Sequence, residues 1–225
     1  MENPSIEELR NSDKYELIAQ LNHRQIKEFV INQLAENGKI TKIYMIYQVL
    51  MILTGIFFFT RSIVLAFQSS FEPIYYTLAA LVFSFSFLIV IHELLHGIAL
   101  KIIGAPKVNF GGYLRKFIFY AEADSFVINR KQFAFIALTP LFVVKLITLI
   151  GIIFFFNLPV FYFLIFVMSA HSLFCAGDIG LLSVFYKNKN SEIFTFDVKA
   201  EKTSYFYKLR TSGHGLSQVR DFVLK

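Results

Sequence analysis

The sequence predicts an all-α membrane protein, in which a bundle of about four transmembrane helices carries a small cytoplasmic β-hairpin. Of its 225 residues, 56% are hydrophobic, 28 are phenylalanine and only 17% are charged, which is far from the composition of a soluble protein. Four apolar stretches are also long enough to cross a bilayer, which requires about 20 helical residues. We therefore expect a multi-pass protein of the cell membrane.

The four predicted spans occupy residues 43–60, 74–100, 133–156 and 160–186. Lysine and arginine residues gather before the first span, between the second and third, and after the fourth. The opposite loops hold only Arg61 with Glu72, and the tripeptide at 157–159. By the positive-inside rule, both termini and the middle loop face the cytoplasm. The net charge of +6 follows from this topology, so nucleic-acid binding is not expected.

The predicted four-span domain occupies residues 43–186. Two segments lie outside this domain, at the N- and C-termini, and one loop lies between its second and third spans. In the N-terminal segment 1–42, apolar residues at helical spacing between Asp13 and Gly38 predict one or two amphipathic helices. The middle loop 101–132 contains VNFGGYLRKFIFYAEADSF, in which Gly111-Gly112 reads as a turn between two strands and predicts a β-hairpin. The C-terminal tail 187–225 contains EIFTFDVKAEKTSYFYKL, a candidate for a second strand pair. The single Cys175 excludes an intrachain disulfide.

The motif most informative about chemistry is HELLH at residues 92–96, inside the second span. His92 and His96 are four residues apart, so on a helix both imidazoles lie on one face and can bind one metal ion. In this zincin arrangement the two histidines hold Zn²⁺, and the glutamate, here Glu93, takes a proton from the zinc-bound water. The alternative is a structural cluster bonded to neighbouring helices, but a carboxylate at this depth needs a partner such as a metal.

A catalytic zinc site needs a third protein ligand. The candidates are Asp178, His171, Glu122 and Asp124. The second and fourth spans each begin after a proline, Pro73 and Pro159, and His92 and Asp178 each lie nineteen residues further on. The two side chains therefore reach nearly the same depth, which predicts Asp178 as the third ligand. His171 lies roughly 10 Å away along the same helix, and it stays an alternative.

Several motifs carry a resemblance to known proteins. HELLHGIALKIIGAP, FIALTP and HSLFCAGDIGLLSVF resemble a zincin-peptidase family of small bacterial membrane proteins and, more distantly, the site-2-type intramembrane metalloproteases; the likeness covers about residues 78–186. In site-2 proteases the third ligand is an aspartate of a Pro-Asp-Gly motif, which Asp178 in AGDIG matches without the proline. AEADSF is similar to the Glu-x-x-Ala-Asp ligand helix of CaaX-protease relatives, with different spacing, which keeps Glu122 as an alternative ligand.

These observations favour a zinc-dependent metalloendopeptidase of the HExxH type, with Zn²⁺ as its cofactor. We expect Glu93 to be the catalytic residue, His92, His96 and Asp178 to bind the metal, and cleavage to occur near the cytoplasmic face. The expected partners are a membrane protein or peptide substrate and the lipid bilayer. One alternative is a non-catalytic metal-binding regulator or immunity-type protein that retains the site. A transporter is disfavoured because four spans without an inverted repeat offer no pathway.

Overall fold

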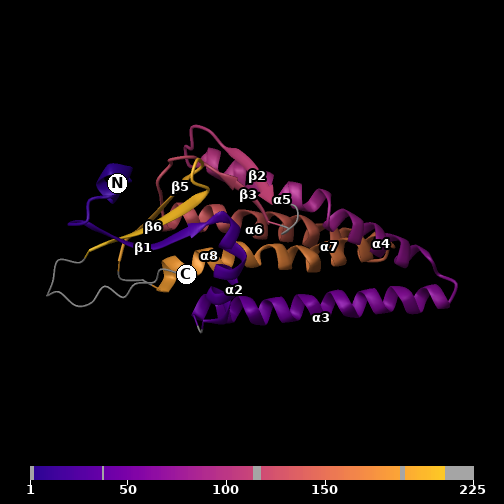
Figure 1. Ribbon diagram of the computed structural model, residues 1–225. Helices are drawn as coiled ribbons and strands as arrows, with labels where there is room; N and C mark the ends of the chain where they lie inside the picture. Colours follow the sequence, from indigo (N-terminus) through magenta and orange to yellow (C-terminus); the bar gives the residue numbers. More distant parts are fainter. Residues whose placement is uncertain (1–2, 37, 114–117, 188–190, 211–225) are drawn as a thin grey trace.

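The computed structural model describes residues 3–36, 38–113, 118–187 and 191–210, and it is mostly helical, with the strands gathered at one end of a helical bundle (Figure 1). The helices are α1 (Ile6–Leu9), η1 (His23–Gln25, a 3₁₀ turn), α2 (Ile26–Ala35), α3 (Lys39–Phe67), α4 (Glu72–Ser84), α5 (Phe87–Ile102), α6 (Arg130–Phe154), α7 (Val160–Phe174) and α8 (Ala176–Lys187). The strands are β1 (Tyr15–Asn22), β2 (Asn109–Tyr113), β3 (Ile118–Glu122), β4 (Ile128–Asn129), β5 (Ile193–Val198) and β6 (Thr203–Leu209).

Two of the predicted spans are single helices, and the other two are broken. Among the described residues, α3 and α6 are each long and apolar enough to cross a membrane; α3 contains the predicted span 43–60, and α6 covers 133–154 of the predicted span 133–156. The stretch 74–100 is divided into α4 and α5, which are bent by 48°, and 160–186 is divided into α7 and α8, bent by 44°. The structure therefore has two such helices, or up to four spans if each bent pair counts as one.

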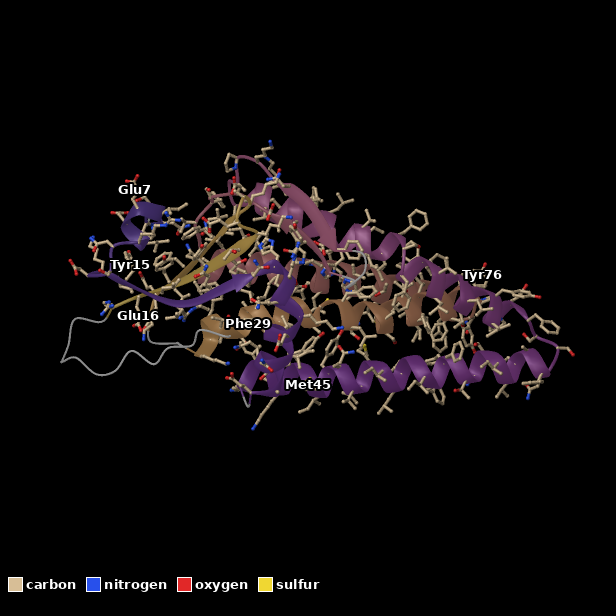
Figure 2. The ribbon with its side chains drawn as sticks, viewed as in Figure 1. Glu7, Tyr15, Glu16, Phe29, Met45 and Tyr76 are labelled. Atoms are coloured by element: carbon tan, nitrogen blue, oxygen red, sulfur yellow. The ribbon has the colours of Figure 1, made fainter. Side chains whose placement is uncertain are left out.

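The bundle is organised around α7, which contacts α3, α4 and α6. The outer surface of α3 is strongly apolar, and Met45 projects from it, away from the other helices (Figure 2). Other large apolar side chains exposed on this helix are Ile43, Ile46, Val49, Leu50, Leu53, Ile56 and Phe57. A soluble protein rarely exposes so large a contiguous apolar surface. This surface is compatible with a membrane protein.

A four-stranded antiparallel sheet, in the order β1-β6-β5-β4, lies at one end of the bundle and corrects the all-α prediction. The β5-β6 pair confirms the strand pair expected in the tail. The helix expected at the start of 13–38 is wrong, because Tyr15–Asn22 is the strand β1; α2 follows it as a helix. Along β1, Tyr15 lies opposite Leu209 and Asn22 opposite Thr203, so a distant strand supplies its hydrogen bonds.

The hairpin in the middle loop is confirmed by the pairing of β2 with β3, from Asn109 opposite Glu122 to Tyr113 opposite Ile118. The expectation that Gly111-Gly112 forms its turn is wrong, because both glycines lie inside β2; residues 114–117, between the two strands, lie outside the described residues. Gly111 is required because a Cβ atom there would come 2.5 Å from the Tyr120 ring. The glycine makes room for a cross-strand aromatic side chain.

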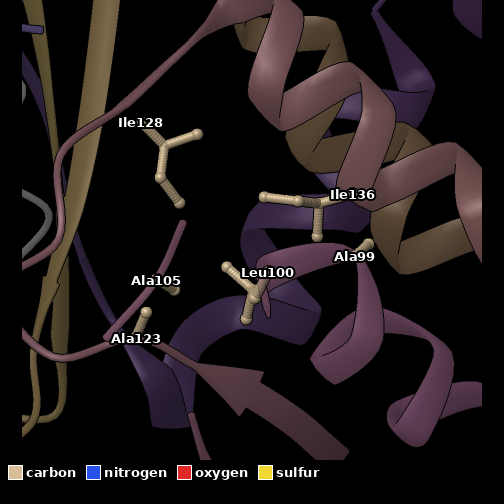
Figure 3. Close-up of a cluster of buried hydrophobic side chains, with 6 residues drawn as sticks. All are labelled: Ala99, Leu100, Ala105, Ala123, Ile128 and Ile136. Atoms are coloured by element: carbon tan, nitrogen blue, oxygen red, sulfur yellow. The ribbon is translucent and has the colours of Figure 1, made fainter. Parts of the chain in front are cut away.

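The hairpin packs against α5 through two close contacts. At Gly97, directly after the HELLH motif, an added Cβ would come 2.6 Å from the Phe110 ring of β2. A buried cluster then joins the end of α5 to α6 and to the segments that leave the hairpin (Figure 3). Its members are Ala99, Leu100, Ala105, Ala123, Ile128 and Ile136. This packing holds β3 beside the helix that carries both motif histidines.

The pairing of β1 with β6 places the first and last strands of the described residues side by side, so we expect both strands on the same side of the membrane. In a Cys175→Ala background, we expect Ser69→Cys, in the loop between α3 and α4, to react with a membrane-impermeant maleimide in intact cells. Asp13→Cys and Ala200→Cys should react only after permeabilisation, which also serves as the labelling control. External labelling of Ala200→Cys would contradict the topology.

Candidate metal centre

The two motif histidines lie one turn apart on the buried face of α5, as their spacing predicts. His92 is 5% exposed and His96 is 7% exposed. Their Nε2 atoms are 3.1 Å apart, so both imidazoles point at the same position. The helix thereby presents two nitrogen ligands to one ion.

Asp178 reaches the same position from the first turn of α8, directly after the break that separates α8 from α7. Its Oδ1 lies 3.1 Å from His96 Nε2, and its Oδ2 lies 3.2 Å from His92 Nε2. The structure thus brings together the three residues that the sequence nominated, although they come from helices more than eighty positions apart in the chain. Among the described residues, His92, His96 and Asp178 form a group able to hold a metal ion.

The second ring nitrogen of His96 is positioned by a proline. His96 Nδ1 lies 3.0 Å from the carbonyl oxygen of Ile136 on α6. Four residues further on is Pro140, which is fully buried inside the helix and has no backbone N–H. The Ile136 carbonyl therefore lacks its usual helical donor and accepts a hydrogen bond from His96 Nδ1–H. This bond fixes the tautomer in which Nε2 is free to bind a metal.

His171, an alternative third ligand, instead lies behind His92. Its Nε2 is 3.1 Å from His92 Nδ1, and its Nδ1 is 3.7 Å from the sulfur of Cys175. His92, His171 and Cys175 are all buried and form a second compact group of potential ligands. Because His171 occupies the Nδ1 side of His92, the Nε2 of His92 stays directed at His96 and Asp178. This arrangement resembles the outer partner that orients a metal-binding histidine.

Glu93 and the remaining acidic candidates have different surroundings. Glu93 lines a cavity together with the three grouped residues, and its buried Oε2 has no hydrogen-bond partner among the described residues. The backbone N–H of Ala121 on β3 donates to the Glu93 carboxylate. Asp124 lies outside the lining and accepts a 2.9 Å hydrogen bond from the Lys199 backbone N–H, so it links the segment after β3 to the end of β5. Glu122 also lines the cavity, but it does not join the metal-binding group.

The cavity has a volume of about 640 Å³ and extends between α5, α8, α2 and both sheets. Its lining also includes His23, Glu122, Asp197 and Ser204. Sequence analysis missed His23, Asp197 and Ser204 as cavity residues. No local signal could have found them, since they lie on the two terminal segments and reach the cavity only through the β1-β6-β5 pairing.

The donor set fits a zinc ion. Ligand atoms placed tetrahedrally at about 2.0–2.1 Å from Zn²⁺ are separated from one another by roughly 3.3 Å. The two Nε2 atoms are 3.1 Å apart, Asp178 Oδ1 lies 3.1 Å from His96 Nε2, and the other carboxylate oxygen, Oδ2, lies 3.2 Å from His92 Nε2. Two imidazoles and one carboxylate are a usual catalytic zinc set, which leaves a fourth position for water. His92, His96 and Asp178 therefore have the chemistry and spacing of three zinc ligands.

Comparison with known proteins agrees with this chemistry. Residues 85–193, a little under half of the chain, match the model of a family described as "Putative zincin peptidase". The matched segment runs from the start of α5 to the first residue of β5, so it contains all three grouped residues and Glu93. No curated protein and no solved structure matches the chain. The match supports the class of zinc metallopeptidases.

The contact of His96 with the Ile136 carbonyl predicts that Pro140 contributes to zinc affinity, although Pro140 touches no ligand directly. Pro140→Ala restores a backbone N–H, which should return the Ile136 carbonyl to the helix and leave His96 Nδ1 without its partner. We expect zinc affinity to fall by about 10-fold, as for other outer partners of metal-binding histidines. The measurement is competition with a fluorescent zinc chelator, with Pro159→Ala as the matched control. Unchanged affinity in Pro140→Ala would contradict this role.

Proposed function

We propose that the protein is a membrane-embedded zinc metallopeptidase that hydrolyses peptide bonds near the cytoplasmic face of the membrane. The observation that carries this proposal is the convergence of His92 Nε2, His96 Nε2 and the Asp178 carboxylate within 3.2 Å of one another, at the wall of a cavity that also contains Glu93. The family match over residues 85–193 supports the same class of enzyme.

In this proposal, the two histidines and Asp178 share the task of metal binding, and Glu93 has the separate task of proton transfer. His92, His96 and Asp178 hold the zinc, which when bound acidifies a water molecule and polarises the substrate carbonyl. The Glu93 carboxylate accepts a proton from the attacking water and delivers it to the nitrogen of the leaving amine. The Oε2 atom of Glu93, buried and without a partner among the described residues, is available for this transfer.

The position of strand β3 supports the proposal that the substrate binds in an extended conformation. The Ala121 N–H donates to Glu93 and so points towards α5, away from β2. A peptide that lies along this edge of the hairpin gains backbone hydrogen bonds and passes beside Glu93. A cavity of about 640 Å³ has the size of sites that bind a short stretch of ligand. We infer that the substrate is a membrane protein or peptide bound as a strand in this cavity.

The proposal assigns metal binding and proton transfer to different residues, so variants can separate the two. Purified protein should hold one Zn²⁺ per chain. Asp178→Ala should lose most of this zinc, because a site with an open position has only three protein ligands. Glu93→Gln keeps the size of the side chain but removes the base, so zinc should stay while peptide turnover falls by roughly 10²-fold or more. Zinc content is measured by elemental analysis, and turnover with a quenched fluorescent peptide library.

Different outcomes would contradict different parts of the proposal. If Asp178→Ala keeps stoichiometric zinc while Glu122→Ala or His171→Ala loses it, Asp178 is not the third ligand. If the wild-type protein holds zinc, but its Glu93→Gln variant gives the same peptide turnover and the same membrane proteome in cells, the protein is a metal-binding regulator rather than a peptidase. Glu16→Gln, an exposed carboxylate on β1, is the control that should change neither readout.

A further inference from the structure

The cavity contains a second group of polar side chains, none of which belongs to the metal-binding group. It consists of His23 from η1, Glu122 from β3, Asp197 from β5 and Ser204 from β6, all of which line the cavity. His23 is 3% exposed and Glu122 is 4% exposed, so both side chains are buried in the wall of the cavity. We call these four residues the His23–Glu122 pocket.

Hydrogen bonds within the pocket determine which atoms of His23 are acceptors. Ser204 Oγ donates to Asp197 Oδ1 at 2.5 Å, so the lone pairs of this hydroxyl are free to accept. His23 Nε2 lies 3.4 Å from Ser204 Oγ and 4.0 Å from Asp197 Oδ1, and it is therefore the protonated nitrogen. Burial lowers the pKa of His23, which keeps the ring neutral. Its Nδ1 is then an acceptor.

Glu122 adds a second acceptor that faces this nitrogen. Its Oε2 lies 3.9 Å from His23 Nδ1, which is too long for a direct hydrogen bond. Both atoms are buried, and neither has a hydrogen-bond partner among the residues that the structure describes. Unsatisfied buried acceptors are costly and call for an explanation. Two acceptors that point into one cavity are suited to a group with several N–H donors and no acceptor.

The charge of the pocket indicates that this donor is a cation. Burial, followed by the charges of Asp197 and Asp124, raises the pKa of Glu122, while Lys199 acts in the opposite direction. Burial raises the pKa of Asp197 as well. Lys199 Nζ itself donates at 3.1 Å to the side-chain oxygen of Asn109, the residue paired with Glu122 in the hairpin. A bound cation would satisfy both acceptors and offset the repulsion between the carboxylates.

We propose that the His23–Glu122 pocket is a specificity subsite that binds the lysine or arginine side chain of a substrate residue close to the cleaved bond. This inference rests on the proposed peptidase function. Glu122 directly follows Ala121, whose N–H contacts Glu93, and adjacent residues of a strand are only about 3.3 Å apart along it. A substrate strand on this edge therefore passes both the base and the pocket, within a few residues of each other.

The test compares arginine with citrulline, which has nearly the same shape but no charge. Quenched fluorescent peptides with acetylated N-termini carry one or the other at a single position, so the side chain is their only cation. We expect the full-length protein in nanodiscs to cleave the arginine peptides roughly 10- to 100-fold faster, as charged hydrogen bonds in a buried site suggest. Glu122→Gln should reduce this ratio to near 1, Glu122→Asp should keep most of it, and Glu16→Gln should leave it unchanged.

A binding measurement separates failure of the subsite from failure of the peptidase. Zinc-loaded Glu93→Gln protein is titrated with the same peptides carrying a fluorescent label, so no turnover is needed. Tighter binding of the arginine peptide, lost in the double variant with Glu122→Gln, supports the subsite even if no cleavage is found. If wild-type and Glu93→Gln protein each bind the arginine and citrulline peptides with the same affinity, the subsite proposal is wrong. The pocket then holds a bridging water only. An equal loss for both peptides in Glu122→Gln, with a lowered melting temperature, assigns Glu122 a structural role instead.

Discussion

The structure depends on one constraint, which is that a polar group buried in an apolar bundle must find a partner. His92, His96 and Asp178 meet at the place where three helices supply such partners. Each histidine uses one nitrogen for a neighbouring helix, and this leaves the other nitrogen directed at the carboxylate. The orientation of the candidate metal centre is thus a consequence of how the bundle satisfies its buried polar atoms.

The same constraint applies where α7 ends and α8 begins. A helix that ends inside a bundle leaves carbonyl groups without helical donors. In the last turn of α7, Tyr44 from α3 donates to the Ser172 carbonyl, and Gln48 donates to the Ser172 hydroxyl at 3.1 Å. Directly after this turn the chain bends and begins α8, whose first turn carries Asp178. The long helix α3 therefore stabilises the position of the segment that carries Asp178, although α3 contributes no residue to the site.

The cavity makes the terminal strands part of the candidate active site. The bundle supplies His92, His96 and Asp178 to the lining of the cavity, and the two sheets supply Glu122, Asp197 and Ser204. β3 joins these two groups, because Ala121 contacts Glu93 and Glu122 faces His23.

Local sequence determined the features that depend on spacing along one element. It placed α3 and α6, the hairpin of β2 with β3, and the shared face of His92 and His96, since helix and strand periodicity act over a few residues. Counting residues from Pro73 and Pro159 also nominated Asp178, because a helix rises by a constant amount per residue. Only the tertiary structure decided that Tyr15–Asn22 is a strand and that His23 and Asp197 join the cavity. The partner that stabilises β1 is β6, more than 180 residues away, and a hydrogen bond at that distance leaves no periodic signal in the chain.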